Sequence, residues 1–288
     1  MPRLSETILH STFFLYRSKD DAVRGVDCGG TGFAVYMPSD SVEDISYFYG
    51  VTNWHVAVRD GCSVIRLNSL DGSTDILELG PEDWVFDTNG DDLAIAPIQP
   101  DFNRHALTPI PIALIYPRNL LHDRSGMNVG LGDDVVMVGR FVDLENGPSN
   151  LPTARFGNIS ASLVHIPQSA PTAGPRESYC LDMHSRTGFS GSPVFIYRTP
   201  GSDLVRHLEM NAPELRSAMF ALLGVHFGQF SEQWRIRGQT GTVVEGVSGM
   251  TGVIPAWRIR DLLSLTALAS QREDSDEKWK PRSPEVQT

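Results

Sequence analysis

The stretch that decides the fold is Gly-Phe-Ser-Gly-Ser-Pro at 188–193, and two other short strings precede it along the chain. Val-Thr-Asn-Trp-His occupies 51–55, and Asp-Leu-Ala-Ile occupies 92–95. Each string sets a histidine, an aspartate or a serine beside an apolar run of the kind that forms β-strands. A histidine, an aspartate and a serine in this order match one of the orders in which a nucleophilic triad is distributed along a chain.

The composition is typical of a chain with many short strands. The 288 residues are 41% hydrophobic, which is enough for a packed core, and the 26 glycines and 19 prolines are scattered between short apolar runs. We therefore expect an all-β fold. The first group of strands is expected at 8–16, 32–36, 47–53, 63–68 and 92–98. The second group is expected at 134–141, 154–166, 179–183, 193–197, 218–227 and 242–247.

The pattern divides the chain into two antiparallel β units joined by the Pro-rich stretch 97–118. Apolar residues at helical spacing follow Pro255, which suits the first turn of a helix. After Ser270 the sequence is charged and poor in aliphatic residues, which is typical of disorder. A polar insertion at 198–217 is expected to form an elaborated hairpin or a short helix. The expected parts are an N-terminal β unit at 1–115, a C-terminal β unit at 116–254, a helix at 255–270 and a disordered tail at 271–288.

The balance of charges argues against several classes of partner. The formal net charge is -11, and no cluster of Lys and Arg is present to bind nucleic acid or an anionic membrane. The first residues lack the pattern of a secretory signal, and no apolar run is long enough to cross a bilayer, so we expect a cytoplasmic protein. The cysteines Cys28, Cys62 and Cys180 lack metal-ligand spacing and are expected to be reduced thiols. No metal or organic cofactor is implied.

The three short strings contain the groups that covalent catalysis by serine needs. A serine hydroxyl is a weak nucleophile near neutral pH, so it requires an imidazole to take its proton and a buried carboxylate to orient that imidazole. We assign His55 as the base, Asp92 as its partner and Ser190 as the nucleophile. Asp91 competes for the carboxylate role, but Asp92 directly precedes the apolar run that would bury it. The separations of 37 and 98 residues place the histidine and aspartate in the first β unit and the serine in the second.

The glycine-rich turn around the serine has a chemical use of its own. Backbone N–H groups that converge in a sharp turn can bind the oxyanion that develops during acyl transfer. The candidate donors are the N–H groups of Gly188 and Ser190. The plain alternative is a structural β-turn before Pro193.

On these residues the chain resembles the chymotrypsin-fold, trypsin-like serine proteases, from about Gly29 to Leu263. The matching stretches are 30–33, 51–55, 92–95 and 188–194. The resemblance implies two six-stranded antiparallel β-barrels followed by a C-terminal helix, with the histidine and aspartate on the first barrel and the serine on the second. It also implies the roles of base, orienting carboxylate and nucleophile that the residue chemistry assigns.

Within this fold, the motifs are most similar to those of the bacterial glutamyl endopeptidases. The similar strings are Ser-Gly-Ser-Pro-Val-Phe at 190–195 and Leu-Gly-Val-His-Phe-Gly at 223–228. The substrate-binding residues that the resemblance implies are Ser185, His226, Phe227 and Gly228. A partly buried imidazole can bind a substrate carboxylate or, as a neutral ring, a Gln amide, so cleavage after Glu is expected, with Asp or Gln as alternatives. The plain alternative is that His226 bonds neighbouring backbone inside the barrel.

The sequence therefore predicts a serine endopeptidase that acts on polypeptides through an acyl-enzyme. The alternative is a catalytically silent domain of the same fold that binds peptides or a regulatory protein partner. An esterase built on an α/β sheet fits less well, because its residues would run Ser, Asp, His and its serine turn would need Gly in place of Ser192.

Overall fold

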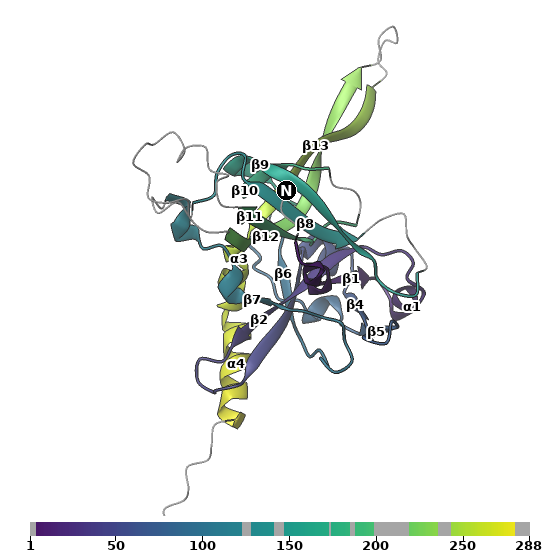
Figure 1. Cartoon of the computed structure of the whole chain (residues 1–288), viewed down its shortest axis with the longest axis vertical. Helices are drawn as coiled ribbons and strands as arrows, with labels where there is room; N and C mark the ends of the chain where they lie inside the picture. Colours follow the sequence, from purple (N-terminus) through teal and green to yellow (C-terminus); the bar gives the residue numbers. More distant parts are fainter. Residues whose placement is uncertain are drawn as a thin grey trace, which may run out of the picture.

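The computed structural model describes residues 4–122, 128–140, 147–172, 174–184, 188–198, 219–235 and 243–279. The β-strands form two units that lie against each other, and the C-terminal helices run down one side (Figure 1). This arrangement confirms the predicted all-β fold with two β units. The insertion expected at 198–217 lies, from residue 199 on, outside the described residues.

The N-terminal unit is a seven-stranded sheet. Its strands are β1 (Thr12–Tyr16), β2 (Gly30–Pro38), β3 (Ser46–Thr52), β4 (Val64–Asn68), β5 (Thr74–Leu77), β6 (Ala94–Ile98) and β7 (Ile110–Pro111). Six of them follow the antiparallel order β5-β4-β1-β2-β3-β6. The seventh, β7, comes from the Pro-rich join and runs parallel to β2. The structure differs here from the expected six-stranded barrel in two ways. The sheet contains a seventh strand, β7, and among the described strands β5 and β6 are edge strands that do not pair with each other.

The C-terminal unit is a closed six-stranded barrel, as predicted. Its strands are β8 (Asp134–Arg140), β9 (Pro152–Pro167), β10 (Pro175–Asp182), β11 (Pro193–Arg198), β12 (Met219–Arg235) and β13 (Val243–Pro255). They close in the order β10-β13-β12-β11-β8-β9. The far ends of β12 and β13 continue beyond the barrel as a two-stranded ribbon (Figure 1), in which Trp234 pairs with Val244.

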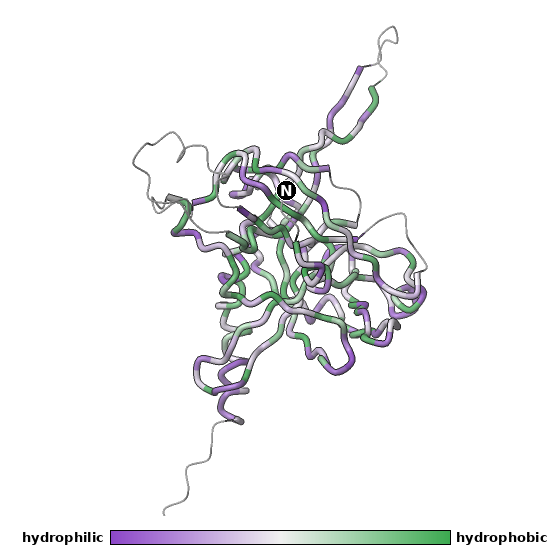
Figure 2. Tube along the Cα trace, viewed as in Figure 1, coloured by the Kyte–Doolittle hydropathy of each residue, from purple (hydrophilic) through white to green (hydrophobic). Residues whose placement is uncertain are grey.

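The two units share one hydrophobic core. Phe33 and Val51 of the sheet belong to the same buried cluster as Val136 and Phe195 of the barrel. Ile259, from the helix that follows the barrel, completes the cluster. Figure 2 shows hydrophobic residues gathered where the units meet and hydrophilic residues on the outer loops. Because apolar burial is the main favourable term in folding, this shared core fixes one unit against the other.

The short helices connect the strands and close the chain. They are α1 (Lys19–Arg24), the 3-10 helices η1 (Glu6–Ser11), η3 (Pro81–Asp83), η4 (Ile112–Leu114) and η5 (Arg118–His122), and the π-helix η2 (His55–Arg59). Among the described residues, no helix is long and apolar enough to span a membrane. The same residues contain no group of three His, Cys, Asp or Glu side chains that could hold a metal ion.

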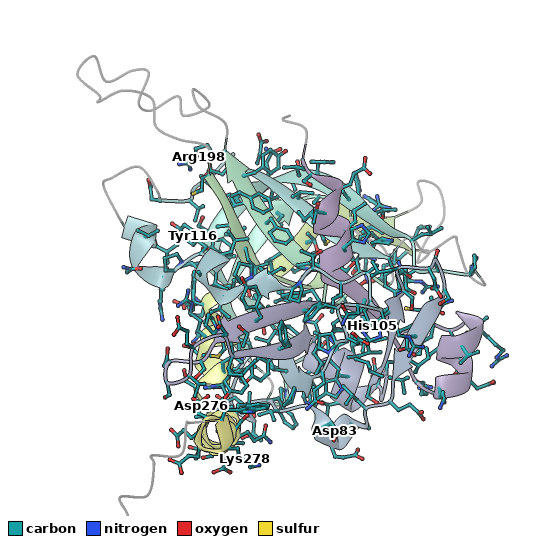
Figure 3. All side chains as sticks on the ribbon, turned by 60° about the horizontal axis from the view of Figure 1, so that its bottom comes forward. Asp83, His105, Tyr116, Arg198, Asp276 and Lys278 are labelled. Carbon is teal, nitrogen blue, oxygen red and sulfur yellow. The ribbon has the colours of Figure 1, made fainter. Side chains whose placement is uncertain are left out.

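The C-terminal end is more ordered than the sequence predicts. Two helices, α3 (Trp257–Leu263) and α4 (Thr266–Trp279), replace the expected helix at 255–270, so the predicted disorder from residue 271 is wrong as far as Trp279. Residues 280–288 lie outside the described part of the chain. The physical reason is tertiary: Asp276, labelled in Figure 3, is buried and accepts hydrogen bonds from the hydroxyls of Ser39 and Tyr47. A composition rule for disorder does not register such contacts.

These contacts make the stability of the protein depend on Asp276. In Asp276→Ala the hydroxyls of Ser39 and Tyr47 lose a buried acceptor, so we expect the free energy of unfolding to fall by about 1–3 kcal/mol. Denaturant unfolding measures the change. Asp274→Ala, on the exposed side of the same helix, is the matched control and should stay within about 0.5 kcal/mol of the wild type. Equal effects of the two substitutions would contradict this account of α4.

Candidate active site

Strand pairing brings His55 and Asp92 together. β3 ends at Thr52, three residues before the histidine, and β6 begins at Ala94, two residues after the aspartate. The two strands are antiparallel, and Thr52 lies opposite Ala94. The end of one strand therefore lies beside the start of the other, and the residues just beyond them meet.

Both oxygens of the Asp92 carboxylate bond to His55. Oδ2 lies 2.6 Å from the ring Nδ1, and Oδ1 accepts a hydrogen bond of 2.9 Å from the backbone N–H of His55. The Asp92 side chain is fully buried, whereas that of His55 is 12% exposed. Since a carboxylate accepts, Nδ1 carries the proton and Nε2 is left as the acceptor, which is the tautomer that a general base requires.

The backbone of Asp92 is also held at both ends. Its carbonyl accepts a 2.9 Å hydrogen bond from the side-chain amide of Asn53, and its N–H donates to Oε1 of Gln168 at 2.9 Å. Sequence reasoning did not single out Gln168, and no motif around it could have done so.

Asp91, the alternative candidate for the carboxylate role, does not contact His55; its carboxylate lies beside Arg258 and Gln168. Burial raises the pKa of Asp91, and Arg258 opposes this effect.

The turn that carries Ser190 depends on two glycines. Gly188 has φ of +90° and Gly191 has φ of +84°, values that favour glycine. Ser192 N–H closes the turn by donating to the carbonyl of Phe189 at 3.0 Å. A Cβ at Gly191 would stand 2.0 Å from the carbonyl oxygen of Thr31, so the turn is pressed directly against the N-terminal sheet.

Thr31 holds the turn from the opposite unit. Its N–H donates to the carbonyl of Ser190 at 2.9 Å, and its Oγ1 donates to the carbonyl of Gly188 at 2.8 Å. Within the described part of the chain, the N–H groups of Gly188 and Ser190 have no hydrogen-bond acceptor. These two N–H groups are therefore available for an oxygen of a ligand.

The segments that carry His55 and Ser190 meet at Gly30. A Cβ there would lie 2.8 Å from Cγ1 of Val56, which follows His55, and 3.1 Å from the carbonyl oxygen of Ser190. No hydrogen bond joins Ser190 Oγ to His55 in the described structure. Catalytic hydrogen bonds are often long before substrate binds and tighten in the complex. The structure thus brings together the His55 ring, the Asp92 carboxylate and the serine turn, although Ser190 Oγ is not hydrogen-bonded to His55.

His226, on β12, braces the serine turn. Its carbonyl accepts from Gly191 N–H and its N–H donates to the carbonyl of Ser192, both at 2.9 Å. Its ring Nδ1–H donates to the carbonyl of Phe189 at 3.0 Å, while Nε2 has no partner among the described residues. Burial lowers the pKa of His226 to about 4; the bond to Phe189 opposes this shift, and nearby His55 adds to it. The ring is therefore neutral near pH 7, with a buried acceptor at Nε2.

The other three residues expected to bind substrate differ in where the structure places them. Ser185 lies outside the described residues. Phe227 is buried, and its ring occupies the space where a side chain at Gly252 would stand, with Cζ 2.3 Å from that Cβ position. Gly228 borders open space, and its carbonyl accepts a 2.6 Å hydrogen bond from Thr251 Oγ1. The described part of β12 therefore borders open space at Gly228, two residues after His226.

Comparison with known proteins supports the fold. No protein-family model matches the sequence, and no curated protein matches it. The solved MamO protease domain from Magnetospirillum magneticum, in its apo form, is similar, with a TM-score of 0.52 and 15% identity over 90% of this chain and 98% of that chain. The Rv3671c protease from M. tuberculosis, in its active form, has a TM-score of 0.45 and 19% identity over 88% of this chain and 78% of that chain. The likeness to the MamO domain confirms a trypsin-like double-barrel fold.

The neutral state of His226 has a measurable effect on stability. Its pKa is about 4 in the folded protein and about 6.5 in the unfolded chain, so the unfolded chain binds the additional proton between these values. Stability should therefore fall as the pH is lowered through this window, by up to about 1.4 kcal/mol per pH unit from this group.

The matched variant is His226→Asn, whose amide can still donate to the carbonyl of Phe189 but takes up no proton. We expect unfolding experiments between about pH 4 and about pH 7 to give a shallower dependence of stability on pH for this variant. Parallel curves for the two proteins would contradict the buried, neutral state of His226.

Proposed function

We propose that this protein is a serine endopeptidase. The observation that carries the proposal is the pair of hydrogen bonds from His55 to the fully buried Asp92 carboxylate, beside a serine turn docked on the same unit. A buried carboxylate that fixes one tautomer of a partly exposed imidazole leaves Nε2 ready to accept a proton. The double-barrel fold agrees with this chemistry but does not by itself establish it.

The reaction would proceed in two halves. Ser190 Oγ attacks the carbonyl carbon of the scissile peptide while His55 Nε2 takes the hydroxyl proton, and Asp92 stabilises the resulting imidazolium. The N–H groups of Gly188 and Ser190 are placed to receive the oxyanion of the tetrahedral intermediate. His55 then passes the proton to the leaving amine, which leaves an acyl-enzyme, and a water activated by His55 releases the acyl group.

An activity-based probe tests the nucleophile. A fluorophosphonate should label the folded wild-type protein once, because it reacts with a serine activated by a neighbouring base. We expect no labelling of Ser190→Ala and normal labelling of Ser192→Ala, a matched control two residues away on the same turn. Intact-mass spectrometry reads the adduct. Equal labelling of wild type and Ser190→Ala, or none in folded wild type, would refute the assignment.

One observation favours a second candidate function. Ser190 Oγ has no hydrogen bond to His55 in the described structure, as expected for a domain of this fold that binds peptides without cleaving them. A peptide library incubated with the protein separates the two functions. Retained binding without cleavage products supports the silent binding domain, and cleavage products that disappear in Ser190→Ala support the peptidase.

We further propose that the residue before the scissile bond is Gln at neutral pH, with Glu and Asp accepted more readily as the pH falls. The argument rests on His226, whose Nε2 is an acceptor while Nδ1–H bonds to Phe189. An acceptor pairs with the amide N–H of Gln, whereas a carboxylate needs a proton on one of the two groups. The motif resemblance assigns Ser185 to the same pocket, and that role stays a prediction.

Two peptides that differ only in Gln or Glu at this position test the preference. The ratio of kcat/KM for the Gln peptide to that for the Glu peptide should exceed one at about pH 8 and fall towards about pH 5. In His226→Asn the ratio should lose most of this pH dependence. A preference for basic or aromatic residues that survives this substitution would exclude the proposed pocket.

A further inference from the structure

We propose that Gln168 is a positioning residue that fixes the backbone of Asp92 and couples the His55–Asp92 pair to the C-terminal helix α3. Only the expected change in kcat rests on the proposed function. The effect of Gln168 on the His55–Asp92 hydrogen bond can be measured without catalysis. The contacts of one buried side-chain amide carry it.

The amide of Gln168 has a defined orientation. The residue follows β9 and is 8% exposed. Its Oε1 accepts from Asp92 N–H at 2.9 Å, and its Nε2 donates to Asp91 Oδ1 at 3.2 Å and to Ser178 Oγ at 3.0 Å. Ser178 in turn donates its hydroxyl proton to the carbonyl of Arg176 at 3.1 Å. A flipped amide would set its NH2 group against the N–H of Asp92, so one orientation satisfies every partner.

The far side of the network reaches α3. The other oxygen of Asp91, Oδ2, lies 3.2 Å from Nε of Arg258, which is on that helix. Arg258 also lies 3.7 Å from Glu177 of β10 and 3.2 Å from Asp261 of α3. Because Asp91 is buried, its charge depends on Arg258 and Gln168 for compensation. The loop at 91–92 is thus held between α3, the barrel and the N-terminal sheet.

This network determines the position of Asp92 and therefore the length of its hydrogen bond to the His55 ring. The side chain of Asp92 is set by His55 and its carbonyl by Asn53, both from its own unit, while its N–H is held by Gln168 from the barrel side. Loss of the last contact leaves a buried N–H without an acceptor, and the peptide before Asp92 must move to find one. Such a movement lengthens the bond from Oδ2 to His55 Nδ1, and small misplacements of catalytic groups have large effects on rate.

Proton NMR of the free protein is the first test. A short N–H···O bond between His55 Nδ1 and a carboxylate gives a resonance far downfield of other protons, which His55→Ala identifies. We expect Gln168→Met, of similar volume but without polar groups, to shift or abolish that resonance. Ser178→Ala removes another partner of the same buried amide and should lower stability without moving the resonance.

Steady-state kinetics with a peptide substrate is the second test. We expect Gln168→Met to lower kcat by on the order of 10-fold with KM within about twofold of the wild type, because the change affects the transition state and not binding. Arg258→Met, at the other end of the network, should change the resonance and kcat in the same direction. Gln99→Met, at an exposed glutamine, is the matched control.

The two tests separate this inference from the proposed function. A shifted resonance in a protein that cleaves no peptide supports the positioning role and refutes the peptidase. An unmoved resonance in folded Gln168→Met overturns the positioning role, whatever the activity of the wild type. If Gln168→Met does not fold, Arg258→Met decides: a changed resonance supports the coupling to α3, and an unchanged one overturns it.

Discussion

The burial of the Asp92 carboxylate is the constraint on which the rest of the site depends. A fully buried charge is tolerated where hydrogen bonds replace the lost water, and His55 supplies them through its backbone N–H and its ring. This requirement fixes the ring, the short helix that begins at His55 and the meeting of the β3 and β6 ends. The site is therefore a consequence of how the N-terminal sheet accommodates one carboxylate, and the barrel adds the serine turn beside an imidazole that is already oriented.

A small number of hydrogen bonds orient the serine turn where the two units meet. Thr31 binds two carbonyls of the serine turn, and His226 bonds to the same turn from the barrel. The shared apolar core holds the halves at a fixed separation, and these polar contacts set the orientation of the turn within it. Apolar packing is insensitive to direction, whereas hydrogen bonds are directional. The hydrogen bonds from Thr31 and His226 therefore decide where the N–H groups of Gly188 and Ser190 point.

Much of this arrangement could be predicted from the sequence. The apolar runs beside His55, Asp92 and Ser190 indicated the strands, and the choice of Asp92 over Asp91 agrees with the contact to His55. In the N-terminal sheet, β5 was not predicted, because it is half-buried throughout and lacks an apolar alternation. The helix up to Trp279 and the hydrogen bond of Gln168 to Asp92 depend on contacts between residues far apart in sequence, and neither periodicity nor motif spacing carries that information.

The glycine at position 191 cannot be used to decide whether a homologue of this chain is catalytically active. Its positive φ and the carbonyl of Thr31 at 2.0 Å from the missing Cβ make glycine a requirement for joining the two halves, independent of any reaction. A descendant that had lost its nucleophile would have to retain this glycine in order to fold. The glycine in an alignment thus reports an intact architecture, and it cannot distinguish a working enzyme from an inactive homologue.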